Sequence, residues 1–112
     1  MRISACAAVY LYEVLHLVTS PIGARIRQAI AQKRLIEVAY KAGRRIAEPH
    51  DYGRIAGTDR LLIFQLRPAR GWRMLDVPKI ESLTILDGTF AGSRGNPRQG
   101  HHSWDEIYAR VG

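Results

Sequence analysis

The sequence contains very little cysteine and very little lysine. Cys6 is the single cysteine among 112 residues, so the chain can form no internal disulfide and no cysteine-based zinc site. A lone thiol suits a reducing compartment, and we expect a cytoplasmic protein. Lysine supplies three of the 17 basic residues, and arginine supplies the other 14.

The excess of arginine bears on the kind of partner. The formal net charge is +7, and the planar guanidinium group binds phosphate or carboxylate through two hydrogen bonds. The composition therefore favours an anionic partner, although GC-rich coding explains the same bias. Charge alone does not separate nucleic acid, nucleotide and acidic protein as partners.

No apolar run is long enough to cross a bilayer, and we predict no membrane association. The run from Ile3 to Leu11 resembles the start of a signal peptide, but Glu13 and His16 interrupt the apolar character of the next residues. Pro21 comes directly after the candidate cleavage site and disfavours cleavage. We interpret the first 20 residues as an apolar helix that packs against the body or a partner, with a signal peptide as the alternative.

The sequence also lacks the motifs of enzymes, with no glycine-rich phosphate loop, nucleophile elbow or paired carboxylates. His50-Asp51 and His101-His102 with Asp105 come nearest to a metal or acid–base group. Adjacent histidines do not face one another on a strand, and no further ligand stands at a spacing that closes a site. We therefore expect no catalysis, no metal and no cofactor.

The pattern of apolar residues predicts one helix followed by strands. Ser20-Pro21 is an N-cap with proline at the first helical position, and apolar residues recur at helical spacing to about Lys33. The period then changes to two. Strands are predicted at residues 35–40, 46–56, 61–66, 71–80 and 81–86, the last extended by Phe90. Pro49 must lie at an edge or a bulge.

Short strands at even spacing with tight turns predict a mainly β fold with flanking helices, built on a small closed or nearly closed five-stranded barrel. Ser103 to Glu106 has the spacing of a capping box and predicts a short C-terminal helix through Val111. The expected organisation is an apolar helical segment at 1–20, a barrel domain with its leading helix at 21–92, and a glycine-rich loop with the short helix at 93–112.

From Ile26 to Phe90 the chain resembles a WYL domain, a bacterial regulatory module with an Sm-like barrel. The helix followed by "VAY" and then "EPH" is similar to the start of that domain. "RMLDVPKI" is similar to its most characteristic pattern, with Arg73, Leu75, Val77, Lys79 and Ile80 in the matching places. Two features of the chain depart from the family: Leu61-Leu62-Ile63 replaces the Trp-Tyr-Leu tripeptide, and Lys79 stands where arginine is usual.

The resemblance implies a stand-alone ligand-sensing module linked to transcription regulation, without the helix-turn-helix domain that family members usually carry. Nucleotides or single-stranded nucleic acid are the implied ligands. It also singles out Arg73, which shares a strand face with Leu75 and Val77 and is expected to reach a phosphate from the barrel rim, followed by Lys79.

Further arginines surround the three predicted turns and are expected to form one basic patch suited to a phosphate backbone, unless they only keep the protein soluble. They are Arg44, Arg45, Arg54, Arg60, Arg67 and Arg70. Tyr52 and Trp72 are the candidate platforms for stacking a base. The full predicted ligand-binding set is Arg73, Lys79, Arg45, Tyr52, His50, Arg60 and Trp72.

Two alternatives remain open at this point. The first is a structural or interaction protein that forms a homodimer through its terminal helices, where Trp104 and Tyr108 lie four residues apart on one face. The second is a small hydrolase or nuclease that uses His50 or the His101-His102 pair.

Overall fold

The computed structural model describes residues 21–95 and 103–112. In that part the chain forms one α-helix, α2 (Pro21–Gln32), a short 3₁₀ turn, η1 (Val77–Lys79), and six strands. The strands are β1 (Arg34–Tyr40), β2 (Gly43–Ile55), β3 (Thr58–Arg67), β4 (Gly71–Asp76), β5 (Ile80–Thr89) and β6 (Glu106–Arg110). The predicted helix after Ser20 and the five predicted strands are therefore confirmed, within a few residues at their ends. The apolar helix expected at 1–20 lies outside the described residues.

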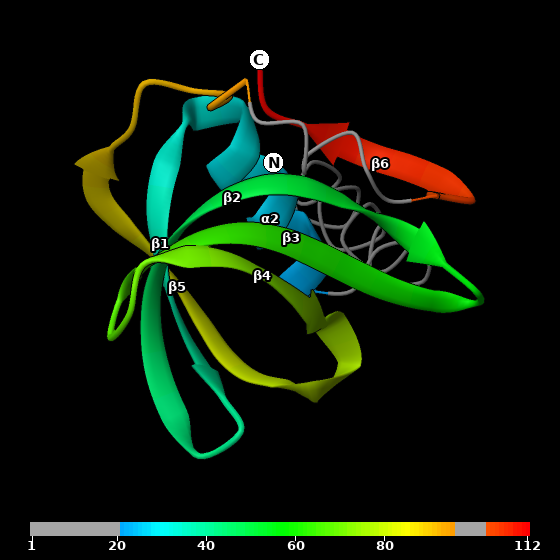
Figure 1. Cartoon of the computed structure of the whole chain (residues 1–112), viewed down its shortest axis with the longest axis horizontal. Coiled ribbons are helices and arrows are strands. Elements are labelled where there is room, and N and C mark those ends of the chain that lie inside the picture. Colours follow the sequence, from blue (N-terminus) through cyan, green and yellow to red (C-terminus); the bar gives the residue numbers. More distant parts are fainter. Residues whose placement is uncertain (1–20, 96–102) are drawn as a thin grey trace, which may run out of the picture.

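The strands form one antiparallel sheet in the order β4-β3-β2-β1-β5, with β6 paired to the second half of β2. Figure 1 shows β2 bending strongly, so that its first half runs beside β1 and its second half runs beside β6. A bulge lies between Pro49 and Asp51 in this strand, which confirms the expected position of Pro49.

The expected closed barrel is wrong, because the sheet stays open. No ladder joins β4 to β5 in the described part of the chain, and these two strands remain at its ends. The chain leaves β4 through η1, where Pro78 has no N–H to donate to a ladder. It then pairs β5 with β1 instead. Across the opening, the Tyr40 hydroxyl accepts a hydrogen bond from the backbone N–H of Asp76 at 3.0 Å.

The expected C-terminal helix is also wrong. Residues Glu106–Arg110 form β6, with Asp51 opposite Arg110 and Arg54 opposite Glu106. β1 covers only the first half of β2, so the backbone groups of the second half need another partner on that side. Pairing with β2 therefore outweighs the local preference of the capping box for a helix.

The core lies on one face of the bent sheet, which we call the core face. Ile26, Ala29 and Ile30 of α2 belong there to one buried cluster with Val38, Leu61 and further apolar side chains of the strands. α2 contacts β1, β2, β5 and β6 and leaves β3 and β4 largely free of helix contact. No helix within residues 21–95 or 103–112 has the length and apolar character needed to span a membrane.

Candidate functional site

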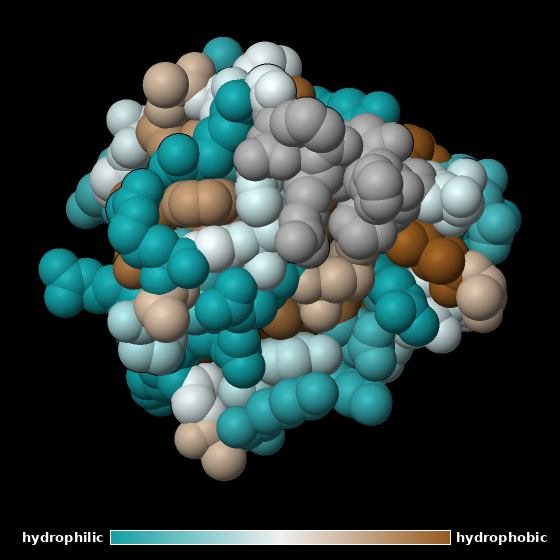
Figure 2. All heavy atoms as spheres, in the orientation of Figure 1, coloured by the Kyte–Doolittle hydropathy of each residue, from teal (hydrophilic) through white to brown (hydrophobic). Residues whose placement is uncertain are grey.

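The topology brings two of the three arginine-bearing turns to the same end of the sheet. β2 and β3 are antiparallel with Ile46 opposite Arg67, so the β1–β2 turn and the β3–β4 turn both lie beyond this pair. We call the residues gathered there the basic end: Lys41, Arg44, Arg45, Arg67, Arg70 and Arg73. Hydrophilic residues cover much of the left and lower part of the view in Figure 2, where Figure 1 shows these two turns.

The third turn, between β2 and β3, lies at the other end of the two strands, on the right of Figure 1. Arg54 and Arg60 belong to it, and both are paired with carboxylates: Arg54 with Glu106 at 3.4 Å and Arg60 with Asp76 at 3.5 Å. The expectation that all three turns form one patch is therefore wrong, because an antiparallel hairpin separates its turn from its open end.

Arg45 is half-buried on the core face of β2. Its Nη1 donates a hydrogen bond of 2.9 Å to Oε1 of Gln65, and its guanidinium carbon lies 5.3 Å from the centre of the Tyr40 ring. The side chain of Gln65 is itself buried and donates from Nε2 to the carbonyl oxygen of Ala69 at 2.8 Å. One amide thus joins Arg45 to the β3–β4 turn.

Arg73 lies on the same face of β4 as Leu75, as predicted from the alternation. Its Nη1 donates to the carbonyl oxygen of Trp72 at 2.9 Å, which turns the guanidinium back over Gly71. A Cβ atom at Gly71 would lie 2.7 Å from that Nη1, and the φ angle of 148° also favours glycine there. Gly71 pairs with Gln65 across the ladder, so both guanidinium groups lie close to the same glutamine.

Neither of these two arginines is neutralised by the described residues. Arginine–carboxylate pairs form elsewhere: Arg34 with Asp87, Arg54 with Glu106, Arg60 with Asp76, Arg94 with Glu48 and Arg110 with Asp51. Within residues 21–95 and 103–112, Arg45 and Arg73 have no carboxylate partner; they donate to an amide oxygen and a backbone carbonyl. Their charges therefore remain available to an external anion.

Lys79 does not join Arg73, although the resemblance places both in one site. Lys79 is exposed in η1, beyond the end of β4, and its Nζ lies 3.6 Å from Oδ2 of Asp76. Arg60 shares the same carboxylate. The guanidinium of Arg73 turns toward the opposite end of β4, over Gly71. The structure therefore does not bring Lys79 or Arg60 beside Arg73. The arginine that it places near Arg73 is Arg45.

Two other predicted residues are buried. Tyr52 is 3% exposed and packs edge-to-face against Tyr108, with ring centres 4.9 Å apart, so it presents no face on which a base can stack. Burial raises its pKa, and the nearby charge of Asp59 raises it further. His50 is completely buried, with Nε2 at 3.2 Å from Oε1 of Glu48. Burial lowers the pKa of His50, and the bond to Glu48 offsets only part of that effect.

Trp72 is half-buried and packs edge-on against its neighbours. Its ring centre lies 4.8 Å from that of His50 and 5.3 Å from that of Phe64. Trp72 faces away from Arg73, because consecutive residues of a strand point to opposite faces. It belongs to an aromatic cluster on the other side of β3 and β4, which we call the outer face.

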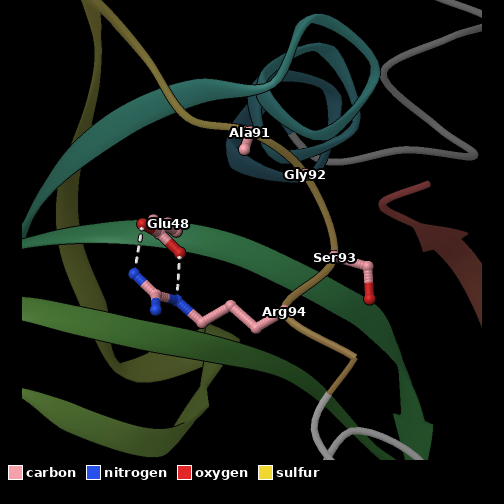
Figure 3. Close-up of a pocket in the computed structure, with 5 residues that line it drawn as sticks. All are labelled: Glu48, Ala91, Gly92, Ser93 and Arg94. Atoms are coloured by element: carbon pink, nitrogen blue, oxygen red, sulfur yellow. Dashed lines mark hydrogen bonds and ion pairs between the residues drawn. The ribbon is translucent and has the colours of Figure 1, made fainter.

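The outer face also carries an ion pair that the sequence did not predict. Glu48 is buried on β2 and receives two hydrogen bonds of 2.8 Å from Arg94, from Nε to Oε1 and from Nη2 to Oε2 (Figure 3). Burial raises the pKa of Glu48, but the bonds from Arg94 and His50 outweigh burial and lower it overall. The glycine-rich surroundings of Arg94 contain no signal of this role, whereas Gln65 stands out in the sequence as a polar residue in an apolar strand.

The described residues contain no group of three or more histidine, cysteine or acidic side chains arranged to hold a metal ion. His101 and His102 lie outside the described residues. Comparison with known proteins found no matching family model, no matching curated protein and no matching solved structure. The resemblance to the WYL domain therefore remains a prediction from the motifs quoted above.

Proposed function

We propose that this chain is a non-enzymatic, WYL-like regulatory module that binds a phosphate-bearing ligand between Arg45 and Arg73. The ligand is a nucleotide or single-stranded nucleic acid. One observation carries the proposal: two half-buried guanidinium groups flank Gln65 on the core face, and no carboxylate of the described residues neutralises them.

The chemistry of these groups fits a phosphate. A guanidinium donates two parallel hydrogen bonds to a phosphate, and hydrogen bonds between charged groups are stronger where water is partly excluded. Gln65 supports the arrangement, because its bonds to Arg45 and Ala69 fix the guanidinium of Arg45 relative to the β3–β4 turn. An arriving phosphate would find one of the two cations already held in place.

The rest of the basic end favours a polymer over a single phosphate. Further exposed cations lie at or beside the two adjacent turns, and one phosphate cannot engage them all: Lys41, Arg44, Arg67 and Arg70. We infer single-stranded nucleic acid as the first ligand to test. A transcription-linked role in the cytoplasm, as the resemblance implies, fits such a ligand.

The alternative of a homodimer held by terminal helices is weaker after the fold is known. The C-terminal helix that it needs is replaced by β6, which pairs with β2 of the same chain. Tyr108, one of its two contact residues, packs against Tyr52 and donates from its hydroxyl to Asp59 at 2.8 Å.

The test is a fluorescence-polarisation panel of labelled single-stranded DNA, RNA and a nucleoside triphosphate, measured over a series of salt concentrations. Arg45→Ala with Arg73→Ala should weaken oligonucleotide binding on the order of 10- to 100-fold, because two charged hydrogen-bonding groups are lost. The slope of log K against log salt should become shallower by about 1.4, because each phosphate contact with a single strand contributes about 0.7.

Arg54→Ala is the matched control, because it removes one positive charge at the other end of β2 and should change the affinity by less than about three-fold. Equal binding by the wild type and the double variant would reject the site. If the protein binds the triphosphate as tightly as it binds the oligonucleotides, the site between Arg45 and Arg73 stands, but single-stranded nucleic acid is rejected as its preferred ligand.

A further inference from the structure

The Glu48–Arg94 ion pair lies on the outer face, behind Gln65. Ala47 and Gln65 pair on the core face, and the next pair along the two strands, Glu48 and Phe64, points to the outer face. The guanidinium of Arg94 lies against this outer pair, Glu48 and Phe64. Its carbon lies 3.8 Å from the centre of the Phe64 ring, while two of its nitrogens bind the Glu48 carboxylate.

This arrangement has the features by which proteins recognise arginine. A carboxylate binds the edge of the guanidinium plane in a fork, and an aromatic ring contacts its face. Nε2 of His50 lies 3.2 Å from Oε1 of Glu48, the oxygen that Nε of Arg94 also contacts, and the His50 ring packs against Trp72. This contact with His50 helps to fix the carboxylate. Burial of Glu48 makes an empty site costly, because an unpaired buried carboxylate is unfavourable.

Among the described contacts of Arg94, those of its side chain with Glu48 and Phe64 fix the guanidinium. Arg94 belongs to the segment 91–95, which forms no helix or strand. The nearest backbone bond to another part of the chain is from the N–H of Ser93 to the carbonyl oxygen of Gly112, at 2.8 Å. The side chain of Arg94 remains 34% exposed. A hollow of about 270 Å³ beside it is lined by Glu48 and residues 91–94, whose positions Figure 3 shows.

We propose that Glu48, His50 and Phe64 form an arginine-recognition site that Arg94 occupies within the chain and that an arginine of a partner polypeptide can take over. The ligand class is set by the occupant: an arginine flanked by small residues, as Gly92, Ser93 and Gly95 flank Arg94. Exchange would release the segment 91–95 and leave a partner on the face opposite Arg45 and Arg73. The site does not depend on the proposed binding of phosphate.

The experiment uses the whole chain and a peptide of the sequence Ala-Gly-Ser-Arg-Gly, which copies residues 91–95. In Arg94→Ala the site is vacated, and this variant should bind the peptide at least about ten-fold more tightly than the wild type, in which Arg94 competes at a high effective concentration. Saturable shifts of the Trp72 indole signal in NMR spectra report binding. The wild type should show the same shifts at millimolar peptide.

Three controls make the result specific. The peptide with lysine in place of arginine should bind at least about ten-fold more weakly, because an ammonium group lacks the fork. Arg94→Ala combined with Glu48→Gln should not bind. Arg70→Ala removes another cation above the same ring, 5.3 Å from its centre, and should gain no affinity. If Arg94→Ala does not fold, Arg94→Lys vacates the fork while keeping the charge.

Absence of binding to both Arg94 variants would overturn the proposal, as would equal binding of the arginine and lysine peptides. Binding by Arg94→Ala with no shift in the wild type at millimolar peptide would also overturn it, because Arg94 would then be a permanent structural clamp.

Discussion

The Nη1 of Arg45 donates to Oε1 of Gln65 at 2.9 Å, and Gly71, over which the guanidinium of Arg73 folds, is the residue paired with Gln65 on the next strand. A single buried amide therefore lies between two cations that come from different strands. The side chain of Gln65 carries no charge, and both its oxygen and its nitrogen have a hydrogen-bond partner. It holds Arg45 without cancelling its charge, which a carboxylate at the same place would do.

A single substitution tests whether the side chain at position 65 must be uncharged. Gln65→Glu would place a carboxylate against Arg45 and near Arg73, and would also set a negative oxygen against the carbonyl of Ala69. We expect oligonucleotide affinity to fall about ten-fold or more, because the internal carboxylate competes with the phosphate. Gln32→Glu makes the same change of charge at the exposed end of α2 and should lower the affinity less than about three-fold. Equal effects of the two variants would show that net charge alone matters.

The buried pair of Glu48 and His50 predicts the pH dependence of stability. The pKa of His50 is lowered below its ordinary value of 6.5 by burial, and that of Glu48 is lowered overall below 4.5 by Arg94 and His50 despite burial. Both groups therefore bind protons more readily in the unfolded chain, so acid favours unfolding. The contribution of His50 is complete above the unfolded pKa and is lost as the pH falls from there toward its folded pKa. That of Glu48 is lost at still lower pH.

Urea denaturation at about pH 8 and about pH 5.5 measures this effect, since histidine titrates between these values. The free energy of unfolding should be lower at the acidic pH, and His50→Gln should reduce the difference between the two. A difference that is unchanged in His50→Gln would assign the pH dependence to other groups.

Gly53 should be the most sensitive glycine of the fold. A Cβ atom there would lie 2.1 Å from the carbonyl oxygen of Glu106 and 2.9 Å from the Trp104 ring, so β6 needs a glycine at this position of β2. Gly53→Ala should lower the free energy of unfolding by about 1–3 kcal/mol, as overpacking does. Gly43→Ala, whose nearest neighbour would be 3.8 Å away, is the matched control and should change it by less than about 1 kcal/mol. Thermal or urea denaturation compares them.

The sequence predicted the local elements well because hydrophobic period and turn residues are local signals. Three examples are the helix start at Pro21, the shared strand face of Arg73 and Leu75, and the bulge next to Pro49. Long-range pairing was harder to predict. The capping box at Ser103 favoured a helix, yet the uncovered half of β2 recruited the segment as a strand. The closed barrel failed for a related reason, since strand spacing does not reveal whether the two end strands meet.

The candidate site was predicted in part. Arg73 and Arg45 were both expected, but their convergence depends on Gln65 and on the fold of Arg73 over Gly71, which no spacing in the sequence reveals. Tyr52 and His50 were expected to contact a ligand and are buried, because Tyr108 of β6 packs against Tyr52, while Trp72 and Phe90 pack against His50. Arg94 gave no signal, because its partner Glu48 lies 46 residues away along the chain.

The central claim is that a phosphate binds between Arg45 and Arg73. The most direct measurement is NMR titration of the ¹⁵N-labelled protein with oligothymidylate, following the side-chain amide of Gln65 and the Nε–H groups of the two arginines. We expect saturable shifts at these three side chains that disappear in Arg45→Ala with Arg73→Ala. Shifts centred on Arg54 and the turn at 56–57, with Gln65 unchanged, would contradict the claim.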